Sequence, residues 1–264
     1  MMRFQIAALV ALGLLLSGCG SNPPDAGGKI PELRPGVLAG YLQPAELPNS
    51  FGFLPPPPEA GSAEMLADEA ANQRALAMQG SDRFRQATAD VDLQFPYAAR
   101  HFQCALGSIV SDADTPALYR LMRRSMVDAG LSTYSAKNQY QRARPFMVNG
   151  QPSCTPETEE ALRQDGSYPS GHAALGWAWA LILSVMEPER ATAILARGYE
   201  FGQSRAVCNV HWQSDVNMGR LAGSAAVARL FANETFRSDF DQATGELKAA
   251  RMRGLGPEVP CTED

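Results

Sequence analysis

The fold is decided by Gly166-Ser-Tyr-Pro-Ser-Gly-His172 and by the apolar run 173–186 that follows it. Pro169 prevents a helix from running through the first part, and Gly171 lets a ligand approach the backbone closely. The apolar run has no polar face, so it predicts a helix that is buried on most sides. Free N–H groups at the start of such a helix can hold a phosphate-like anion. The alternative is that Ser170 does no more than cap the helix.

The sequence predicts helix in almost every stretch after Ser62. Amphipathic patterns, with Pro and Gly between them, predict a series of helices, and convincing alternating strands are absent from the sequence. The expected helices span 63–90 (one or two helices), 115–129, 132–143, 154–164, 173–186, 188–202 and 211–232. We therefore expect an all-α fold, a single-domain helical bundle.

Composition limits the classes of function that the chain can have. It has 264 residues, of which 45% are hydrophobic and 19% are charged, as in one sizeable globular domain. The formal net charge of −5 argues against a nucleic-acid surface. An anion site would therefore need a local concentration of Lys and Arg. The run 173–186 is too short to span a bilayer.

The N-terminus has the features of an export signal. Arg3 precedes an apolar region at 6–16, and Leu16-Ser-Gly-Cys19 resembles the bacterial lipobox, in which the cysteine is lipidated. We expect a lipoprotein signal peptide at 1–18, a flexible tether at 19–50, and the folded domain at 51–264, with 51–54 docked on it as an extended arm. An ordinary cleaved secretory signal is the alternative. Either signal would export the chain, to the periplasm or as an outer-membrane lipoprotein.

Four further cysteines, Cys104, Cys154, Cys208 and Cys261, are even in number and contain no C-x-x-C pair. Disulfides are stable in an oxidising compartment, so export favours them over buried free thiols. Three pairings of four cysteines exist, and spacing does not choose among them.

Two cations precede the central motif. Lys137 and Arg144 are seven residues apart, which is two turns of a helix, so both would project from nearly the same face. Pro145 would then end that helix. A solvated stripe of charge is the alternative for this pair, and we expect Arg142 to be solvated.

A histidine and a carboxylate follow the motif. His211 and Asp215 are four residues apart, which places them on one face of a helix. The carboxylate can then fix the imidazole tautomer and leave the other ring nitrogen free to attack or bind. A surface ion pair is the alternative, although the neighbouring Trp212 argues against full exposure. Arg205 lies just upstream, and His101 has no such partner and receives no role.

Three motifs thus occur in order: Lys137-x6-Arg144-Pro145, Pro169-Ser-Gly-His172 and Ser204-Arg205-x5-His211-x3-Asp215. Together they resemble the tripartite signature of the phosphatidic acid phosphatase type 2 (PAP2) superfamily, which joins bacterial acid phosphatases, lipid phosphatases and vanadium-dependent haloperoxidases. The stretches 166–172, 202–205 and 211–215 are most similar to the class A bacterial non-specific acid phosphatases. Three positions depart from that class: Ala173 replaces a usual Thr, Asn209 a common Gly, and Asn217 a common Asp.

The resemblance implies a helical bundle of the PAP2 and haloperoxidase type and a role for each motif residue. His211 would attack phosphorus and form a phosphohistidine, Asp215 would hold its ring, and His172 would protonate the leaving group and then activate water. The phosphoryl oxygens would be bound by Lys137, Arg144, Ser170, Gly171 and Arg205. No metal or other cofactor is expected. The need for one protonated and one neutral histidine predicts an acidic pH optimum.

The function implied is an exported acid phosphatase for small phosphomonoesters of broad structure, with a phosphotransferase side activity. Inorganic phosphate and vanadate would inhibit it, nucleic acid would not be a partner, and the membrane would be reached only through a lipid on Cys19. The resemblance also implies homo-oligomers and the disulfide pairs Cys154–Cys208 and Cys104–Cys261. The alternatives are a vanadate-dependent haloperoxidase with His211 as the vanadate ligand, and an inactive anion-binding lipoprotein.

Overall fold

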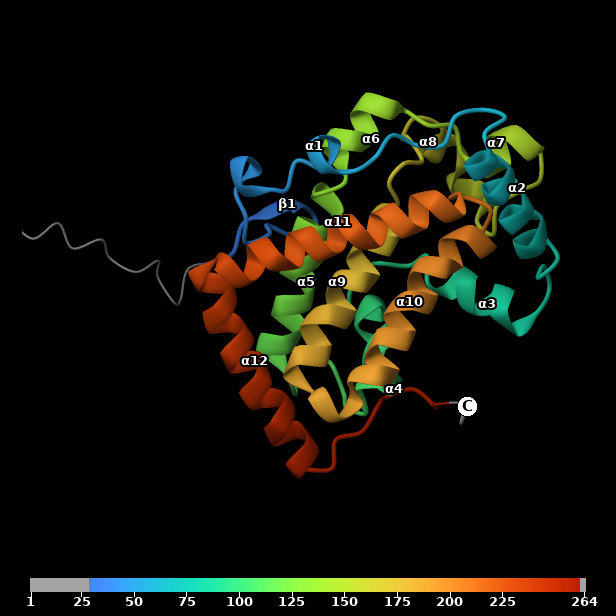
Figure 1. The fold of residues 1–264 in the computed structure, drawn as a ribbon. Helices are drawn as coiled ribbons and strands as arrows, with labels where there is room; N and C mark the ends of the chain where they lie inside the picture. The colour runs from blue at the N-terminus through green and yellow to red at the C-terminus, as the bar shows by residue number, and fades with distance from the viewer. Residues whose placement is uncertain (1–28, 262–264) are drawn as a thin grey trace, which may run out of the picture. The chain divides into compact units, whose positions relative to one another are not determined.

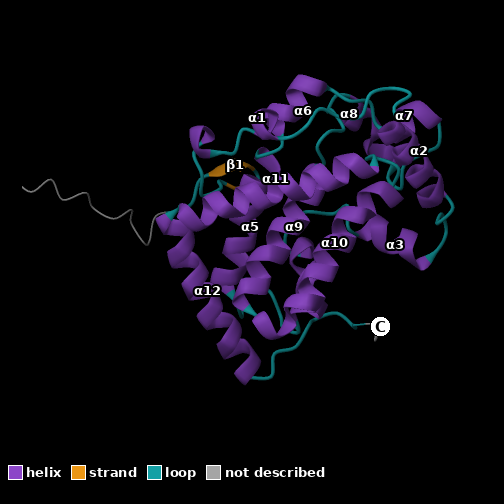
Figure 2. Cartoon of the chain, in the orientation of Figure 1, coloured by secondary structure: helices purple, strands orange, loops and turns teal. Residues whose placement is uncertain are grey.

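The computed structural model describes residues 29–261, and one compact unit begins at Pro31. In the described part of this unit, all the regular secondary structure is helical except for one short antiparallel pair of strands. This confirms the all-α class (Figure 2). The elements are β1 (Glu32–Arg34), β2 (Val37–Leu38), η1 (Pro44–Glu46), α1 (Ser50–Phe53), α2 (Ala63–Leu76), α3 (Asp82–Ala89), η2 (Tyr97–Phe102), α4 (Gln103–Leu106), α5 (Pro116–Leu131), α6 (Tyr134–Tyr140), α7 (Pro145–Asn149), η3 (Pro156–Thr158), α8 (Glu159–Arg163), α9 (Gly171–Met186), η4 (Pro188–Arg190), α10 (Ala191–Val207), α11 (Gln213–Ala232) and α12 (Glu234–Met252).

Helix α9 is the centre of the unit. It packs against α5, α10 and α11, while α12 lies alongside α5, at the opposite end of the unit from α6 and α8 (Figure 1). The Ser170 hydroxyl caps α9 by accepting a hydrogen bond from the Ala173 N–H. Trp179, Ile182 and Leu183 are buried, as expected for a helix with no polar face. The capped N-terminus of α9 is therefore held rigidly inside the bundle.

Two glycines of α11 allow it to approach the start of α9 very closely. A Cβ on Gly219 would lie 2.4 Å from the Ser170 carbonyl oxygen, and one on Gly223 would lie 2.3 Å from that of Ala174. Any side chain at these positions would force the two helices apart. The close packing also brings the Ser170 N–H to within 3.0 Å of the Asp215 carbonyl oxygen. In this way the first turn of α11 lies beside the motif that begins α9.

The helix predicted at 132–143 was wrong at its C-terminal end. Helix α6 ends at Tyr140, where Gln141 adopts the left-handed conformation (φ 43°) that commonly terminates helices. Arg144 then precedes Pro145 as the N-cap residue of α7. Lys137 and Arg144 thus lie on different elements and share no helix face. His211 also lies outside a helix, because α11 begins at Gln213.

The chain enters the compact unit earlier than the expected end of the tether at residue 50. The Asp128 carboxylate accepts hydrogen bonds from the N–H groups of Tyr41 and Leu42, and both of these side chains are buried. Residues 51–54 also differ from the extended arm that was expected, since Ser50–Phe53 forms the short helix α1. The predicted signal peptide, the lipidation site Cys19 and the first part of the tether lie outside the described residues.

The two disulfides that the resemblance implied are present. Cys104 is bonded to Cys261, and Cys154 is bonded to Cys208. The second bridge ties the loop before η3 to the residue that ends α10. None of the helices within residues 29–261 combines the length and the apolar character that crossing a bilayer requires.

Candidate active site

The three sequence motifs meet at the N-terminus of α9. Lys137 comes from α6, Arg205 from the last turn of α10, and Arg144 and His211 from the residues before α7 and α11. Each of these four side chains is almost completely buried. The Arg144 Nη1 atom lies 3.2 Å from His211 Nε2. Burial, and then the charges of Arg144, Lys137 and Arg205, lower the pKa of His211 well below its usual value. The structure therefore gathers the predicted cations around one imidazole.

Backbone carbonyls hold two of the cations. The Lys137 ammonium donates to the Gly166 carbonyl at 2.6 Å. The Arg144 guanidinium donates to the carbonyls of Leu162 and Val210, at 2.9 and 3.0 Å. Burial lowers the pKa of Lys137 to about 8, although the Asp165 carboxylate opposes this shift. These carbonyls fix where each cation lies, and the Asp165 carboxylate lies within ion-pair distance of both.

Arg205 is the third cation, and it lacks partners. Its Nε and Nη1 atoms are buried and make no hydrogen bond to any residue in the described chain. Burial, followed by the charge of Arg144, lowers the pKa of Arg205 to about 9. A buried donor without a partner is costly, and native proteins seldom keep one without a functional reason. The guanidinium therefore has donors that no described residue uses.

The hydrogen bonds of His211 define its tautomer. Arg144 can only donate, so the His211 Nε2 atom accepts and carries no proton. The Nδ1 atom lies 3.3 Å from Ser167 Oγ and 3.5 Å from an Asp215 carboxylate oxygen, and Ser167 donates to that same oxygen. Nδ1 therefore holds the proton, and Nε2 presents its lone pair to the cations. This is the arrangement that a nucleophilic imidazole requires.

Asp215 is held by a residue that the sequence analysis placed in solvent. The Arg142 side chain is only 9% exposed, and its Nη1 donates to an Asp215 carboxylate oxygen at 2.6 Å, while its Nη2 donates to Asp68 at 2.8 Å. Ser214 joins the cluster by donating to Asp68 and accepting from Arg142. The expectation of a solvated Arg142 was wrong. The carboxylates that bury it lie on α2 and α11, and neither is near it in sequence.

Replacement of Arg142 by Met is expected to lower kcat by up to about 10²-fold, because the carboxylate that orients His211 loses its anchor. It should also lower the free energy of unfolding by about 3–5 kcal/mol, because Asp68 and Asp215 would remain buried without their cation. Steady-state kinetics and chemical denaturation measure the two effects. Arg142→Lys keeps the positive charge but not the paired N–H donors of the guanidinium. It should therefore recover the free energy of unfolding more than kcat. A wild-type kcat in Arg142→Met would contradict this role.

His172 is oriented by the loop after α3. Its Nε2 atom lies 3.1 Å from the Val91 carbonyl oxygen, and since a carbonyl only accepts, Nε2 carries a proton. The ring lies nearly parallel to that of Phe201 on α10, at 6.5 Å between centroids. Nδ1 is therefore the nitrogen that can gain and lose a proton. Burial, and then the charge of Arg205, lowers the pKa of His172 well below its usual value.

Ser170 and Gly171 supply neutral donors. The first N–H groups of α9, those of Gly171 and His172, have no partner within the helix. The Ser170 hydroxyl accepts from Ala173 and keeps its own proton free to donate.

All the residues predicted for the site are therefore placed in one neighbourhood. His101, which received no role, lies by contrast with Nε2 2.8 Å from the Asp92 carbonyl oxygen and Nδ1 3.6 Å from Asp90.

The departures from the class A pattern have simple structural settings. Asn209 adopts a left-handed conformation (φ 59°), which asparagine tolerates better than other side chains after glycine. Ala173 is fully buried, and its Cβ lies close to Gly202 and Gly219. Asn217 is exposed on α11. None of the three contacts a predicted site residue through a polar side-chain atom.

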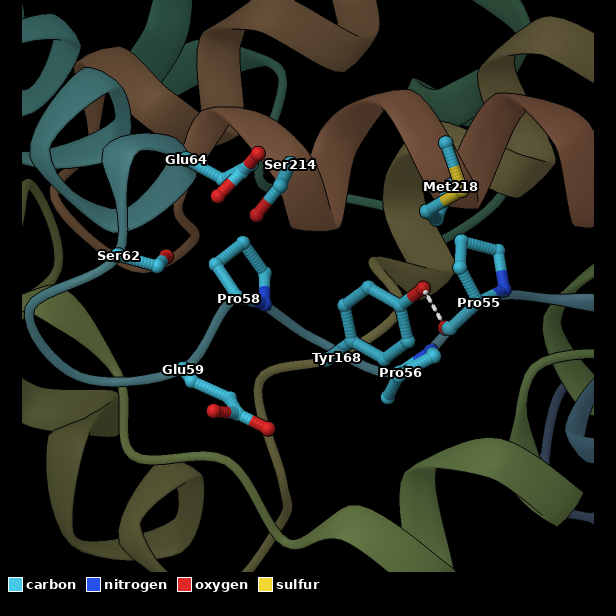
Figure 3. Close-up of a pocket in the computed structure, with 9 residues that line it drawn as sticks. All are labelled: Pro55, Pro56, Pro58, Glu59, Ser62, Glu64, Tyr168, Ser214 and Met218. Carbon is cyan, nitrogen blue, oxygen red and sulfur yellow. Dashed lines mark hydrogen bonds between the residues drawn. The ribbon is translucent and has the colours of Figure 1, made fainter.

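A cavity of about 490 Å³ has in its lining Ser214, the residue that precedes Asp215 in the chain (Figure 3). Its nine lining residues are Pro55, Pro56, Pro58, Glu59, Ser62, Glu64, Tyr168, Ser214 and Met218. The Tyr168 hydroxyl donates to the Pro55 carbonyl at its edge. The lining includes none of the predicted phosphate-binding residues, so the cavity is not the anion site. Within residues 29–261, no group of three or more His, Cys, Asp or Glu side chains is placed to hold a metal ion.

Comparison with known proteins agrees with the geometry. Residues 121–238 match the family model described as the PAP2 superfamily. The chain is 42% identical to a non-specific acid phosphatase of Providencia stuartii over 208 residues, which cover 78% of this chain and 84% of that protein. It is 40% identical to a non-specific acid phosphatase of Salmonella typhimurium, with 78% and 83% covered. An acid phosphatase of Zymomonas mobilis is 38% identical over 206 residues, with 78% of each chain covered.

Proposed function

The chain belongs to the PAP2 superfamily, among the bacterial non-specific acid phosphatases, and from that premise we propose that it hydrolyses phosphomonoesters of broad structure through a phosphohistidine on His211. The observation that carries the proposal is the buried Arg205, whose Nε and Nη1 atoms lack partners, beside His211. A phosphoryl group bound by Arg205, Lys137 and Arg144 would supply the missing hydrogen bonds and balance the cations.

In the first step, the His211 Nε2 lone pair attacks phosphorus and the bond to the ester oxygen breaks. The imidazole becomes positively charged, and its Nδ1–H faces Ser167 and the Asp215 carboxylate, which stabilise that charge. The three cations and the N–H groups at the start of α9 hold the phosphoryl oxygens as their charge develops.

In the same step, His172 donates its Nδ1 proton to the departing alkoxide. The Val91 carbonyl keeps Nε2 protonated, so Nδ1 is the exchanging atom. In the second step, Nδ1 accepts a proton from water, the water oxygen bonds to phosphorus, and the bond to His211 breaks to release phosphate. Transfer to an alcohol in place of water gives the proposed phosphotransferase side activity.

The value of kcat/KM is expected to be greatest at acidic pH and to fall as pH rises. His172 must carry a proton to start the reaction, and burial beside Arg205 lowers its pKa, so it loses that proton at a lower pH than an ordinary histidine. The pKa of His211 is also lowered, so the nucleophile stays neutral under these acidic conditions. A pH series of phosphate release measures this, and a value of kcat/KM that rises through neutral pH would contradict it.

The test of function is phosphate release from a chromogenic phosphomonoester, with inhibition by vanadate and by inorganic phosphate. Turnover without added metal would support the proposal. Halide oxidation by the vanadate-loaded protein, without phosphate release, would favour a haloperoxidase, and binding without turnover would favour an inactive anion-binding protein.

We also propose that the protein is exported to the periplasm or the outer membrane. A lipid on Cys19 would tether it to the membrane. The signal-like residues 1–18 and the pairing of all four remaining cysteines in disulfides support this. Homo-oligomerisation is proposed on family resemblance alone. Metabolic labelling with a fatty acid, compared between the wild type and Cys19→Ser, tests the lipid anchor.

A further inference from the structure

Asp165 lies directly against two of the three cations. One carboxylate oxygen accepts a hydrogen bond from Arg144 Nη2 at 3.1 Å and lies 3.4 Å from Lys137 Nζ. The Asp165 side chain is 37% exposed, whereas those of Lys137 and Arg144 are 3% and 2% exposed. A carboxylate therefore covers the solvent side of a cation pair that the protein otherwise buries.

The carboxylate is not needed to hold either cation in place. Lys137 donates to the Gly166 carbonyl, and Arg144 donates to backbone carbonyls that include those of Leu162 and Val210. These bonds would remain if Asp165 lost its charge. What the carboxylate adds is a negative charge within ion-pair distance of both phosphate-binding cations.

That charge acts against a bound phosphate. A phosphoryl group on Lys137 and Arg144 would bring its own anionic oxygens close to the carboxylate, and like charges at such distances repel. We infer that Asp165 competes with phosphate for Lys137 and Arg144 and so limits the affinity of the site for phosphate. The inference rests on the proposed function, since a phosphatase must release phosphate in every turnover.

Weaker binding of phosphate has a catalytic use. Interactions that stabilise the substrate and the product as much as the transition state lower KM without raising kcat. A site with three unopposed buried cations would retain its product, whereas a carboxylate on two of them allows phosphate to leave. Arg205, which has no such carboxylate contact, remains free to bind the phosphoryl group throughout.

The same carboxylate also sustains the charge of Lys137. The pKa of Lys137 is lowered to about 8 by burial and further by Arg144, while Asp165 and, less strongly, Asp215 raise it. Without Asp165, Lys137 would lose its proton at a lower pH. Removal of the carboxylate should therefore tighten phosphate binding at acidic pH and weaken it as pH approaches about 8.

The test compares Asp165→Asn with the wild-type full-length chain, using inorganic phosphate as the probe in titration calorimetry and as an inhibitor. At acidic pH the variant should bind phosphate about three- to tenfold more tightly and show a matching fall in KM. The matched control is Asp241→Asn, on an exposed position of α12, which removes the same charge and should change neither value. Equal or weaker phosphate binding by Asp165→Asn, with an unchanged thermal midpoint, would overturn the inference.

A pH series separates this role from a structural one. The gain in phosphate affinity should shrink and then reverse between acidic pH and about 8, and a gain that is constant across this range would overturn the link to Lys137. Calorimetry does not depend on turnover, so the two proposals can fail separately. Tighter binding by the variant without hydrolysis by either protein would remove only the proposed function. Hydrolysis by the wild type with equal phosphate affinity in both proteins would remove only the role of Asp165.

Discussion

Replacement of His211 by Ala is expected to lower phosphate release from phosphomonoesters by about 10³-fold or more. The Nε2 lone pair of this residue faces the cations, and its Nδ1 proton faces Ser167 and Asp215. His172 is committed to the Val91 carbonyl through Nε2 and is oriented for proton transfer. Loss of His211 therefore removes the proposed nucleophile and leaves no equivalent group among the residues gathered at the site.

The control is binding of inorganic phosphate to the same variant. The three cations and the start of α9 do not depend on the His211 ring for their main contacts, so His211→Ala should still bind phosphate. Loss of turnover with retained binding identifies a chemical role. Turnover at the wild-type rate would exclude the phosphohistidine mechanism.

Replacement of Arg205 by Met is expected to lower kcat/KM by about 10²–10³-fold and, in the absence of phosphate, to stabilise the fold. The guanidinium is buried, and burial lowers its pKa to about 9, well below its ordinary value, so folding opposes its charge. An apolar side chain of similar length removes that cost, and the free energy of unfolding should rise by about 1–3 kcal/mol. Loss of function and gain of stability in one variant is characteristic of a binding group that the fold keeps unpaired.

Thermal unfolding with and without phosphate checks this prediction. Phosphate should raise the Tm of the wild type, because it binds only the folded state, and should raise that of Arg205→Met much less. The control is Arg85→Met, since Arg85 lies exposed on α3 and pairs with Asp82 at the surface. A destabilised Arg205→Met protein that responds to phosphate like the wild type would contradict the account.

The sequence was sufficient for the fold class and for the central helix, for clear physical reasons. A run of apolar residues with no polar face has to be buried, and α9 is buried against three other helices. The Gly and Ala residues of 211–232 predicted close packing, and α11 does approach α9 closely at Gly219 and Gly223. The strands β1 and β2 are too short to leave an alternating pattern.

The geometry of the cations was harder to predict. The seven-residue spacing of Lys137 and Arg144 predicted that they share one helix face. Instead, the left-handed Gln141 ends α6, and Arg144 reaches the site from the next segment. Arg142 and Asp165 were missed because their partners come from elsewhere in the chain: Asp68 lies on α2, and Lys137 lies 28 positions before Asp165. Local patterns do not report such long-range pairs. The only signal was the position of each residue beside a motif.

The central claim is that His211 carries the phosphoryl group during turnover. The most direct measurement uses His172→Ala with 4-nitrophenyl phosphate, quenched in alkali and analysed by peptide mass spectrometry. In this variant, nitrophenolate can leave without a general acid, whereas the attacking water has lost its general base. The phosphohistidine intermediate should therefore accumulate. One phosphoryl group is expected on the peptide that contains His211, and none once His211→Ala is added. A phosphoryl group on another residue, or none on His211, would contradict it.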